Sequence, residues 1–203
     1  MNRRLAVLIS GRGSNLQSIM DAIGRRELDA SIAVVVSNRP DAAGLTRARA
    51  AGVEAVFLDP RTYPDRDAYD EAIVEVLRKR DVGLVCLAGF MRLVGRPILD
   101  AFPDRILNIH PSLLPSFPGL DAQQQALAHG VRVSGATVHF VTAELDGGAI
   151  VAQAVVPVLD DDTREALSGR ILVEEHRLYP EAIGLVLTGE WQIDGRRFVP
   201  RRR

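Results

Sequence analysis

Residues 105–119, RILNIHPSLLPSFPG, place an asparagine and a histidine at the end of a short apolar run. Asn108 and His110 are two positions apart, so their side chains would share one face of an extended strand. Burying an amide or an imidazole without a partner costs roughly 1–3 kcal/mol. The two groups are therefore either satisfied within the core or directed into a site, where an amide N–H beside an imidazolium N–H would bind an oxyanion.

Asp146, in the segment ELDGG, is the candidate carboxylate for this pair. A carboxylate beside a histidine raises the pKa of the imidazole and fixes the orientation of its ring. The spacing along the chain does not show whether Asp146 reaches His110, and a single histidine at a strand end is more often structural than catalytic. The sequence pattern leaves both interpretations open.

The segment SGRGSNLQ, residues 10–17, could bind an anion. Its glycines allow a tight turn, Ser14 or Asn15 can cap the helix that follows, and the free N–H groups of that helix start favour a phosphate. Leu16 replaces the third glycine of a dinucleotide fingerprint, and no Gly-Lys-Ser/Thr follows. A single phosphate is therefore favoured over a pyrophosphate, with a plain glycine turn as the structural alternative.

Other residues with reactive side chains give weaker signals. Ser112 lies close to His110 in sequence but lacks the Gly-x-Ser-x-Gly elbow of a serine hydrolase. Cys86 lies within the apolar segment GLVCLAG, which favours a small core residue over a nucleophile. Spacings typical of zinc ligands do not occur among the four histidines, which are His110, His129, His139 and His176.

The composition is that of a globular domain, with 203 residues, 47% apolar and 25% charged. A formal net charge of −1 gives no electrostatic reason to expect nucleic acid as a partner, and the basic end RRFVPRRR is expected to be solvated. No apolar stretch approaches the ~20 residues that span a bilayer. The start MNRRLAVLISGRG enters a glycine turn, which favours a first strand over a signal peptide. The single cysteine excludes an intramolecular disulfide and favours a reducing compartment, so we expect the cytoplasm.

The elements that position these residues alternate in the first half of the chain. Strands are predicted at residues 4–10, 31–38, 54–59 and 83–89, and helices at residues 14–25, 42–52 and 65–80. Near-continuous apolar strands are typical of a parallel sheet that is covered on both faces. The short strand that contains Asn108 comes next.

The second half has a different pattern. Two strands joined by a turn at ELDGG are predicted within residues 134–158. A long helix is predicted to begin near Thr163 and to be interrupted or kinked at Pro180. A hairpin with Asp-Gly at its turn is predicted for residues 190–200. Neither repeats nor a linker occur, which predicts one domain.

Six segments together resemble the folate-dependent formyltransferases, and among them the glycinamide ribonucleotide formyltransferase branch. They are LISGRGSNLQSI, SNRPDAAGLTRARAAG, LAGFMRLV, ILNIHPSLLPSFPG, GATVHFVTAELDGGAIV and EEHRLYPEAI. The resemblance runs from about residue 4 to residue 190. It implies an α/β fold, Rossmann-like and three-layered, with a mostly parallel central sheet and a mixed or antiparallel C-terminal extension. Residues 1–203 would form one domain, with a phosphate-binding half at 1–100 and a catalytic and folate-binding half at 101–203.

The resemblance also implies an activity, which is transfer of the formyl group of 10-formyltetrahydrofolate to the amine of phosphoribosylglycinamide in purine synthesis. Asn108, His110 and Asp146 match the family's catalytic residues. The first two would bind the oxyanion, with His110 held cationic by Asp146, and Asp146 would help to move the proton of the amine. The bond from Leu114 to Pro115 is expected to be cis.

Binding residues carry over from the same resemblance. The phosphoribosyl substrate would contact Gly13, Ser14, Asn15, Met91, Pro111, Arg170 and Glu175. The folate would contact Arg66, Met91, Arg92, Leu93, Val94, Asn108, Val141, Ala143 and Asp146, with the turn after Val141 using mostly backbone groups. Two departures stand out. The segment LDAQQQAL lacks histidines that some members carry, which leaves the partner of Asp121 open, and Ala143 replaces an acid that many members have.

Several alternatives remain at this stage. Formyltetrahydrofolate hydrolase resembles this domain but adds an N-terminal domain, and methionyl-tRNA formyltransferase adds a C-terminal one; we expect neither addition here. A dinucleotide-binding redox domain is disfavoured because Ser37 and Asn38 stand where an acid would close the second strand. A phosphate-binding module without activity is the third class. We expect small-molecule partners, no metal, no nucleic acid, no membrane, and a monomer or homodimer.

Overall fold

The computed structural model describes residues 2–201. In this structure the chain divides after Leu107 into two compact units. The prediction of one domain with a division near residue 100 stays a prediction. The basic end includes Arg202 and Arg203, which lie outside the described residues.

The first unit is built on a parallel sheet whose strand order is β3-β2-β1-β4. Its strands are β1 (Arg4–Ile9), β2 (Ser31–Ser37), β3 (Ala55–Phe57) and β4 (Leu84–Leu87). In the register of the sheet, Val7 of β1 lies between Val35 of β2 and Cys86 of β4. All three side chains are fully buried, because a parallel sheet of this kind is covered on both faces.

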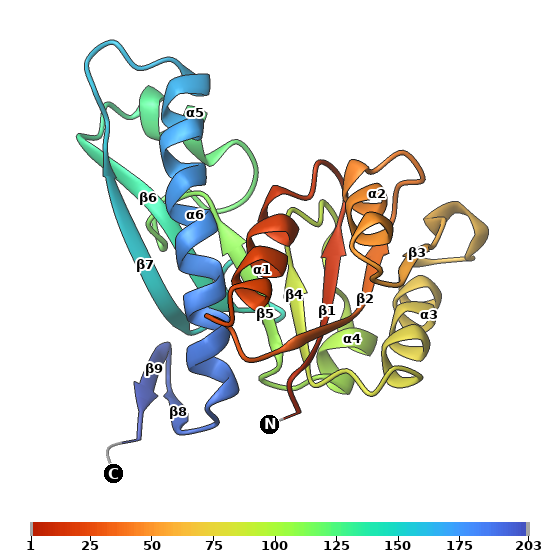
Figure 1. Ribbon diagram of the computed structural model, residues 1–203. Helices are drawn as coiled ribbons and strands as arrows, with labels where there is room; N and C mark the ends of the chain where they lie inside the picture. The colour runs from red at the N-terminus through yellow and green to blue at the C-terminus, as the bar shows by residue number, and fades with distance from the viewer. Residues whose placement is uncertain (1, 202–203) are drawn as a thin grey trace. The chain divides into compact units, whose positions relative to one another are not determined.

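The helices of the first unit pack in two pairs (Figure 1), with α1 beside α2 and α3 beside α4. They are α1 (Ser14–Gly24), α2 (Ala43–Ala50), α3 (Arg66–Arg78) and α4 (Arg96–Ala101), and the 3₁₀ turn η1 spans Pro60–Thr62. The three long helices confirm the sequence-based prediction. The sequence did not predict α4 or η1, because six and three residues are too short to show a helical period.

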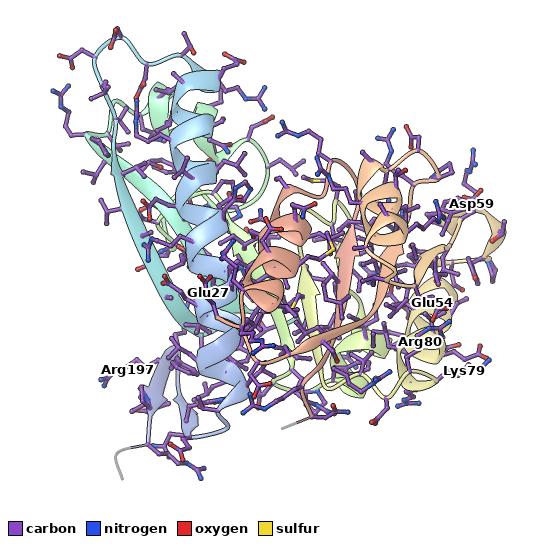
Figure 2. The ribbon with its side chains drawn as sticks, viewed as in Figure 1. Glu27, Glu54, Asp59, Lys79, Arg80 and Arg197 are labelled. Carbon is purple, nitrogen blue, oxygen red and sulfur yellow. The ribbon has the colours of Figure 1, made fainter. Side chains whose placement is uncertain are left out.

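Charged side chains hold the end of α3 near the edge strand β3. Arg80 donates from Nε to Glu54 Oε2 at 2.8 Å, and Figure 2 shows the two side chains close together, with Lys79 beside them. Lys79 pairs with Glu75 one helical turn earlier. Exposed pairs of this kind contribute only about 0–1 kcal/mol each. They therefore fix the position of the end of α3 but add little to the free energy of unfolding.

The second unit contains an antiparallel ribbon and a long helix (Figure 1). Its elements are β6 (Val133–Phe140), β7 (Ile150–Pro157), α5 (Ala122–Ala128), α6 (Arg164–Leu187), β8 (Trp191–Asp194) and β9 (Arg197–Pro200), and β5 (Ile106–His110) leads into it. β6 pairs antiparallel with β7, and α6 packs against both strands. The prediction of a mostly parallel sheet with an antiparallel C-terminal extension is confirmed.

The long helix α6 corrects one prediction. Thr163 is its N-cap, as expected, and the Thr163 hydroxyl accepts the N–H of Ala166 at 3.1 Å. The first of the two outcomes predicted at Pro180, an interruption, is wrong because α6 is continuous over 24 residues, and the second, a kink, stays a prediction. Pro180 costs a helix about 3 kcal/mol, and burial of its neighbours Tyr179 and Ile183 at 0% exposure offsets a cost of this size.

The C-terminal hairpin packs on the end of the ribbon. Trp191 lies 5.1 Å from Phe140 between ring centroids and donates from Nε1 to Val186 O at 2.7 Å. The predicted hairpin is confirmed, but its turn is formed by Gly195 and Arg196, one residue later than expected. Within residues 2–201, every helix is too short or too polar to cross a bilayer.

Candidate active site

The end of β5 presents the asparagine and the histidine of the first motif. Ile106, Leu107 and Ile109 are buried apolar residues, whereas Asn108 is half-buried and His110 is 5% exposed. Pro111 follows at once, and because proline has no N–H to donate, the strand ends there. Asn108 and His110 therefore lie on one face at a strand terminus.

Asp146 lies on the turn between β6 and β7. Its φ of 50° is in the left-handed region, which aspartate tolerates better than most residues. A Cβ on Gly148 would lie 1.8 Å from Phe140 O, so only glycine fits there. The carboxylate is fixed by the segment after β5, since Asp146 Oδ2 accepts the N–H of Gly119 at 2.8 Å.

The structure brings these three side chains into one cluster. His110 Nδ1 lies 3.6 Å from Asp146 Oδ2. A fourth residue joins them from β6, because His139 Nε2 lies 3.2 Å from Asn108 Nδ2 and 3.5 Å from Asp146 Oδ1. Sequence reasoning considered His139 only as a zinc ligand. The signal that could have found it is a histidine in an otherwise apolar strand that leads into the ELDGG turn.

The protonation of His110 differs from the expectation. The Phe117 carbonyl can only accept, so its 2.8 Å contact with His110 Nε2 places a proton on that nitrogen. Burial lowers the pKa of His110 and outweighs the Phe117 carbonyl and the charge of Asp146, which act in the opposite direction. His110 is therefore not held cationic in the protein without substrate, and the expectation that Asp146 does so beside an oxyanion stays a prediction. His110 Nδ1 is the nitrogen that can take up a proton, and it lies beyond hydrogen-bond distance of the Asp146 carboxylate.

Asp146 is ionised at neutral pH. Burial alone would raise the pKa of Asp146, but the neighbouring histidine rings, which are positively charged in the acidic range where a carboxylate titrates, and the Gly119 N–H together hold it below its ordinary value. The cluster thus combines an anionic carboxylate with an imidazole that is able to accept a proton.

The glycine loop before α1 differs from its predicted form. Gly13, not Ser14 or Asn15, is the N-cap of α1, with a φ of 71° and no side chain to accept the first N–H groups. A Cβ on Gly13 would lie 2.7 Å from the Cα of Gly44 in α2. The predicted side-chain cap is wrong because this left-handed glycine occupies the cap position. Asn15 is buried and Ser14 is half-buried in the first turn.

Residues 91–94 form a partly exposed segment of the first unit. The N–H of Met91 donates to Ser10 Oγ at 2.8 Å, and the guanidinium of Arg92 lies 5.0 Å from the Tyr69 ring centroid. Met91 and Leu93 are 70% and 62% exposed. Backbone and cation–π contacts thus fix the segment while two apolar side chains remain uncovered. Arg66, at the start of α3, is also exposed.

Arg170 is paired within the second unit. It donates from Nη1 and Nη2 to the two carboxylate oxygens of Asp162 at 2.8 and 2.9 Å, and from Nη1 to Pro157 O. This bidentate contact lowers the pKa of Asp162 to about 2. Glu175, five residues further along α6, is buried. The predicted phosphate contact of Arg170 would therefore compete with Asp162.

The remaining predicted positions fall into the second unit. Pro111 and Val141 are half-buried, and Ala143 is exposed on the β6–β7 turn. Asp121 pairs with Arg164 of α6. The peptide before Pro115 is cis, as the resemblance implied.

Ser112 does not act with His110 in this structure. It is fully buried, and its hydroxyl donates to Ser116 O at 2.6 Å. A hydroxyl committed to a carbonyl is not activated by an imidazole, which disfavours the serine hydrolase alternative. Among residues 2–201, no group of three acidic, histidine or cysteine side chains is arranged to hold a metal ion.

The sequence matches a known family over most of its length. The formyl transferase family matches residues 3–183. A phosphoribosylglycinamide formyltransferase of Bacillus subtilis (strain 168) is 42% identical over 185 residues, which cover 91% of this chain and 95% of that protein. A trifunctional purine biosynthetic protein of Bos taurus is 46% identical over 92% of this chain, but the chain spans only 18% of that protein's length.

Solved structures agree with this match. The crystal structure of glycinamide ribonucleotide transformylase 1 from Symbiobacterium toebii has a TM-score of 0.97 and 58% identity to this chain, covering 99% of this chain and 95% of that one.

Proposed function

The chain belongs to the formyl transferase family, and from this premise we propose that it transfers the formyl group of 10-formyltetrahydrofolate to the amine of phosphoribosylglycinamide. The product would be the N-formyl ribotide, with tetrahydrofolate released, in purine biosynthesis. The observation that carries this proposal is the cluster of Asn108, His110 and Asp146, which combines oxyanion donors with an ionised carboxylate.

The reaction needs stabilisation of negative charge. When the amine attacks the formyl carbon, a C–N bond forms and the carbonyl oxygen becomes an oxyanion. Asn108 Nδ2 can donate to this oxygen, and so can His110 Nδ1 once it is protonated. Development of the oxyanion favours uptake of that proton from solvent, because a nearby negative charge raises the pKa of an imidazole, and the proton returns to solvent when the oxyanion collapses. Two fixed donors of this kind stabilise a transition state by several kcal/mol.

The reaction also moves a proton. The attacking amine must lose one proton, and the departing nitrogen N10 of the donor must gain one as the bond to the formyl carbon breaks. We assign to Asp146 the role of accepting and returning this proton, directly or through water; its ionised state and its position beside His110 support the assignment. No acyl-enzyme is needed, which agrees with the buried and committed hydroxyl of Ser112.

The phosphate of the substrate fits the start of α1. Gly13 leaves the first N–H groups of the helix without a side-chain acceptor, and such groups bind anions. We assign Ser14 and Asn15 to the same contact. In the second unit we assign Arg170 to the phosphate, Glu175 to the ribose and Pro111 to a neighbouring contact. In the first unit we assign Met91 to the same substrate.

The formyl donor is consumed in the reaction and is therefore a substrate. The uncovered side chains of Met91 and Leu93 fit a flat heteroaromatic ring, since apolar contact with such a ring removes both surfaces from water. We assign Arg66, Arg92 and Val94 to the same ligand in the first unit. In the second unit the assigned contacts are those of Asn108, Val141, Ala143 and Asp146.

A formyl-transfer assay tests the proposal. Purified protein is supplied with both substrates, and formation of the N-formyl ribotide is followed together with release of formate. Ribotide formation without excess formate is expected. Equal release of formate in the absence of the amine would favour the hydrolase alternative, and binding of phosphate with no turnover would favour a silent module. Location in the cytoplasm and a monomeric or homodimeric state stay predictions.

A further inference from the structure

His139 is the member of the cluster that the proposed reaction does not use. Its ring is 2% exposed and lies near the end of β6. Nδ1 lies 2.9 Å from the carbonyl oxygen of Phe140. Nε2 lies 3.2 Å from Asn108 Nδ2 and 3.5 Å from Asp146 Oδ1. Both ring nitrogens are thus engaged by groups of the second unit.

The chemistry of these partners assigns the protons of the ring. A carbonyl oxygen only accepts, so Nδ1 of His139 carries a proton and donates to Phe140 O. An amide nitrogen only donates, so Nε2 accepts from Asn108 Nδ2 at 3.2 Å, while Asp146 Oδ1, at 3.5 Å, lies too far from Nε2 for a well-formed N–H···O bond. The ring is therefore neutral with its proton on Nδ1. The opposite orientation of the Asn108 amide would place Oδ1 against Nε2 and would require an imidazolium.

We propose that His139 is a positioning residue that acts through Asn108. By accepting one N–H of Asn108 Nδ2, it fixes which end of the amide faces the reacting oxygen. The second N–H of the same nitrogen then remains for the oxyanion. With the amide reversed, Asn108 would present a carbonyl oxygen to a developing negative charge, which is repulsive. This inference rests on the formyl transfer proposed above.

Two substitutions of His139 separate the two bonds of its ring. In His139→Asn the side-chain amide can still donate to Phe140 O, but it is too short to reach Asn108. In His139→Gln the longer amide can accept from Asn108 but does not keep the donor at the Nδ1 position. We expect His139→Asn to lower kcat about 10- to 100-fold with KM changed less than threefold, and His139→Gln to restore most of that loss.

A double-mutant cycle shows whether the effect passes through Asn108. In an Asn108→Ala background, His139→Asn should cause less than a twofold further loss of kcat, because the group that it positions is gone. His129→Asn is the matched control, because His129 is exposed and its Nδ1, like that of His139, contacts a backbone carbonyl, here that of Gln125. It should leave kcat unchanged.

Nitrogen NMR of ¹⁵N-histidine-labelled protein tests the proton assignment independently of turnover. The two ¹⁵N shifts of His139, assigned by their loss in His139→Gln, should be those of a neutral ring protonated at Nδ1. Shifts of an imidazolium or of a ring protonated at Nε2 would overturn the proposal, as would equal kcat losses in His139→Asn and His139→Gln or full additivity with Asn108→Ala.

Absence of turnover in the wild type would overturn the proposed function and with it the positioning role of His139. The ¹⁵N shifts would still decide the protonation state of the ring.

Discussion

Asp146 Oδ2 lies 3.6 Å from His110 Nδ1, and the same oxygen accepts the N–H of Gly119 at 2.8 Å. One carboxylate oxygen thus links a strand end, a proline-rich segment and a strand-connecting turn. Because the Gly119 bond fixes the carboxylate, its charge is held beside the nitrogen of His110 that can take up a proton.

Removing the charge of Asp146 while keeping its shape should reduce turnover. Asn tolerates the φ of 50° at this position and can still accept the Gly119 N–H. We expect Asp146→Asn to lower kcat at least 10²-fold in the formyl-transfer assay, a loss comparable to that of an oxyanion donor. Asp160→Asn, which breaks an exposed pair with Arg132 in the same unit, is the control. Turnover within threefold of wild type in Asp146→Asn would rule out our role for this carboxylate.

The lowered pKa of His110 should appear in the pH dependence of stability. The folded pKa of this residue lies below the ordinary value of 6.5, so between the two values the unfolded chain binds more protons. The free energy of unfolding therefore rises with pH through this window, and the contribution is complete above about 6.5. The free energy of unfolding, measured with urea from pH 5 to pH 7.5, should rise less steeply with pH in His110→Gln than in wild type. An unchanged slope would contradict the assignment.

Arg170 should contribute to binding of the phosphoribosyl substrate more than to catalysis. Arg170→Gln removes a bidentate donor, and we expect KM for that substrate to rise about 10-fold with kcat nearly constant. Arg164→Gln is matched to it, since Arg164 also lies on α6 and pairs with an acid, Asp121. The carboxyl pKa of Asp162, about 2 in the wild type, should return toward its ordinary range in Arg170→Gln, as measured by NMR. Equal KM values in the two variants would count against the phosphate contact.

The glycine cap of α1 should be intolerant of any side chain. Gly13 combines a φ of 71° with a Cβ position 2.7 Å from Gly44 Cα, and strain of this kind costs of order 1–3 kcal/mol. We expect Gly13→Ala to lower the free energy of unfolding by about that amount and to raise KM for the phosphoribosyl substrate. Gly11→Ala, where a Cβ meets nothing within 4 Å, should change stability by less than 0.5 kcal/mol. Equal stability of the two variants would show that the loop relaxes.

The sequence predicted the elements that have a clear period. The apolar run of β1 and the amphipathic pattern of α3 suffice to place a parallel strand and a helix, because their burial follows directly from the pattern. The continuity of α6 through Pro180 was not predictable in this way. It depends on tertiary burial of Tyr179 and Ile183, which outweighs the local preference of proline.

The site was predictable in its residue types but not in its protonation. Asn108 and His110 follow from strand spacing, and Asp146 from the resemblance to the formyltransferases. The pKa of His110, however, depends on burial and on the Phe117 carbonyl, neither of which can be read from spacing. The role that we propose for His139 depends on contacts between strands that are distant in sequence, so it required the structure.

Cys86 and Trp191, each the single residue of its type in the chain, lie in different units. Cys86 is fully buried in β4, so a thiol-specific reagent would label it only when the first unit opens. Trp191 packs on Phe140, so its fluorescence would report the loosening of the second unit. The native chain thus contains two independent probes, and coincidence of their signals in one denaturation experiment would reveal whether the two units unfold as one cooperative body or in separate steps.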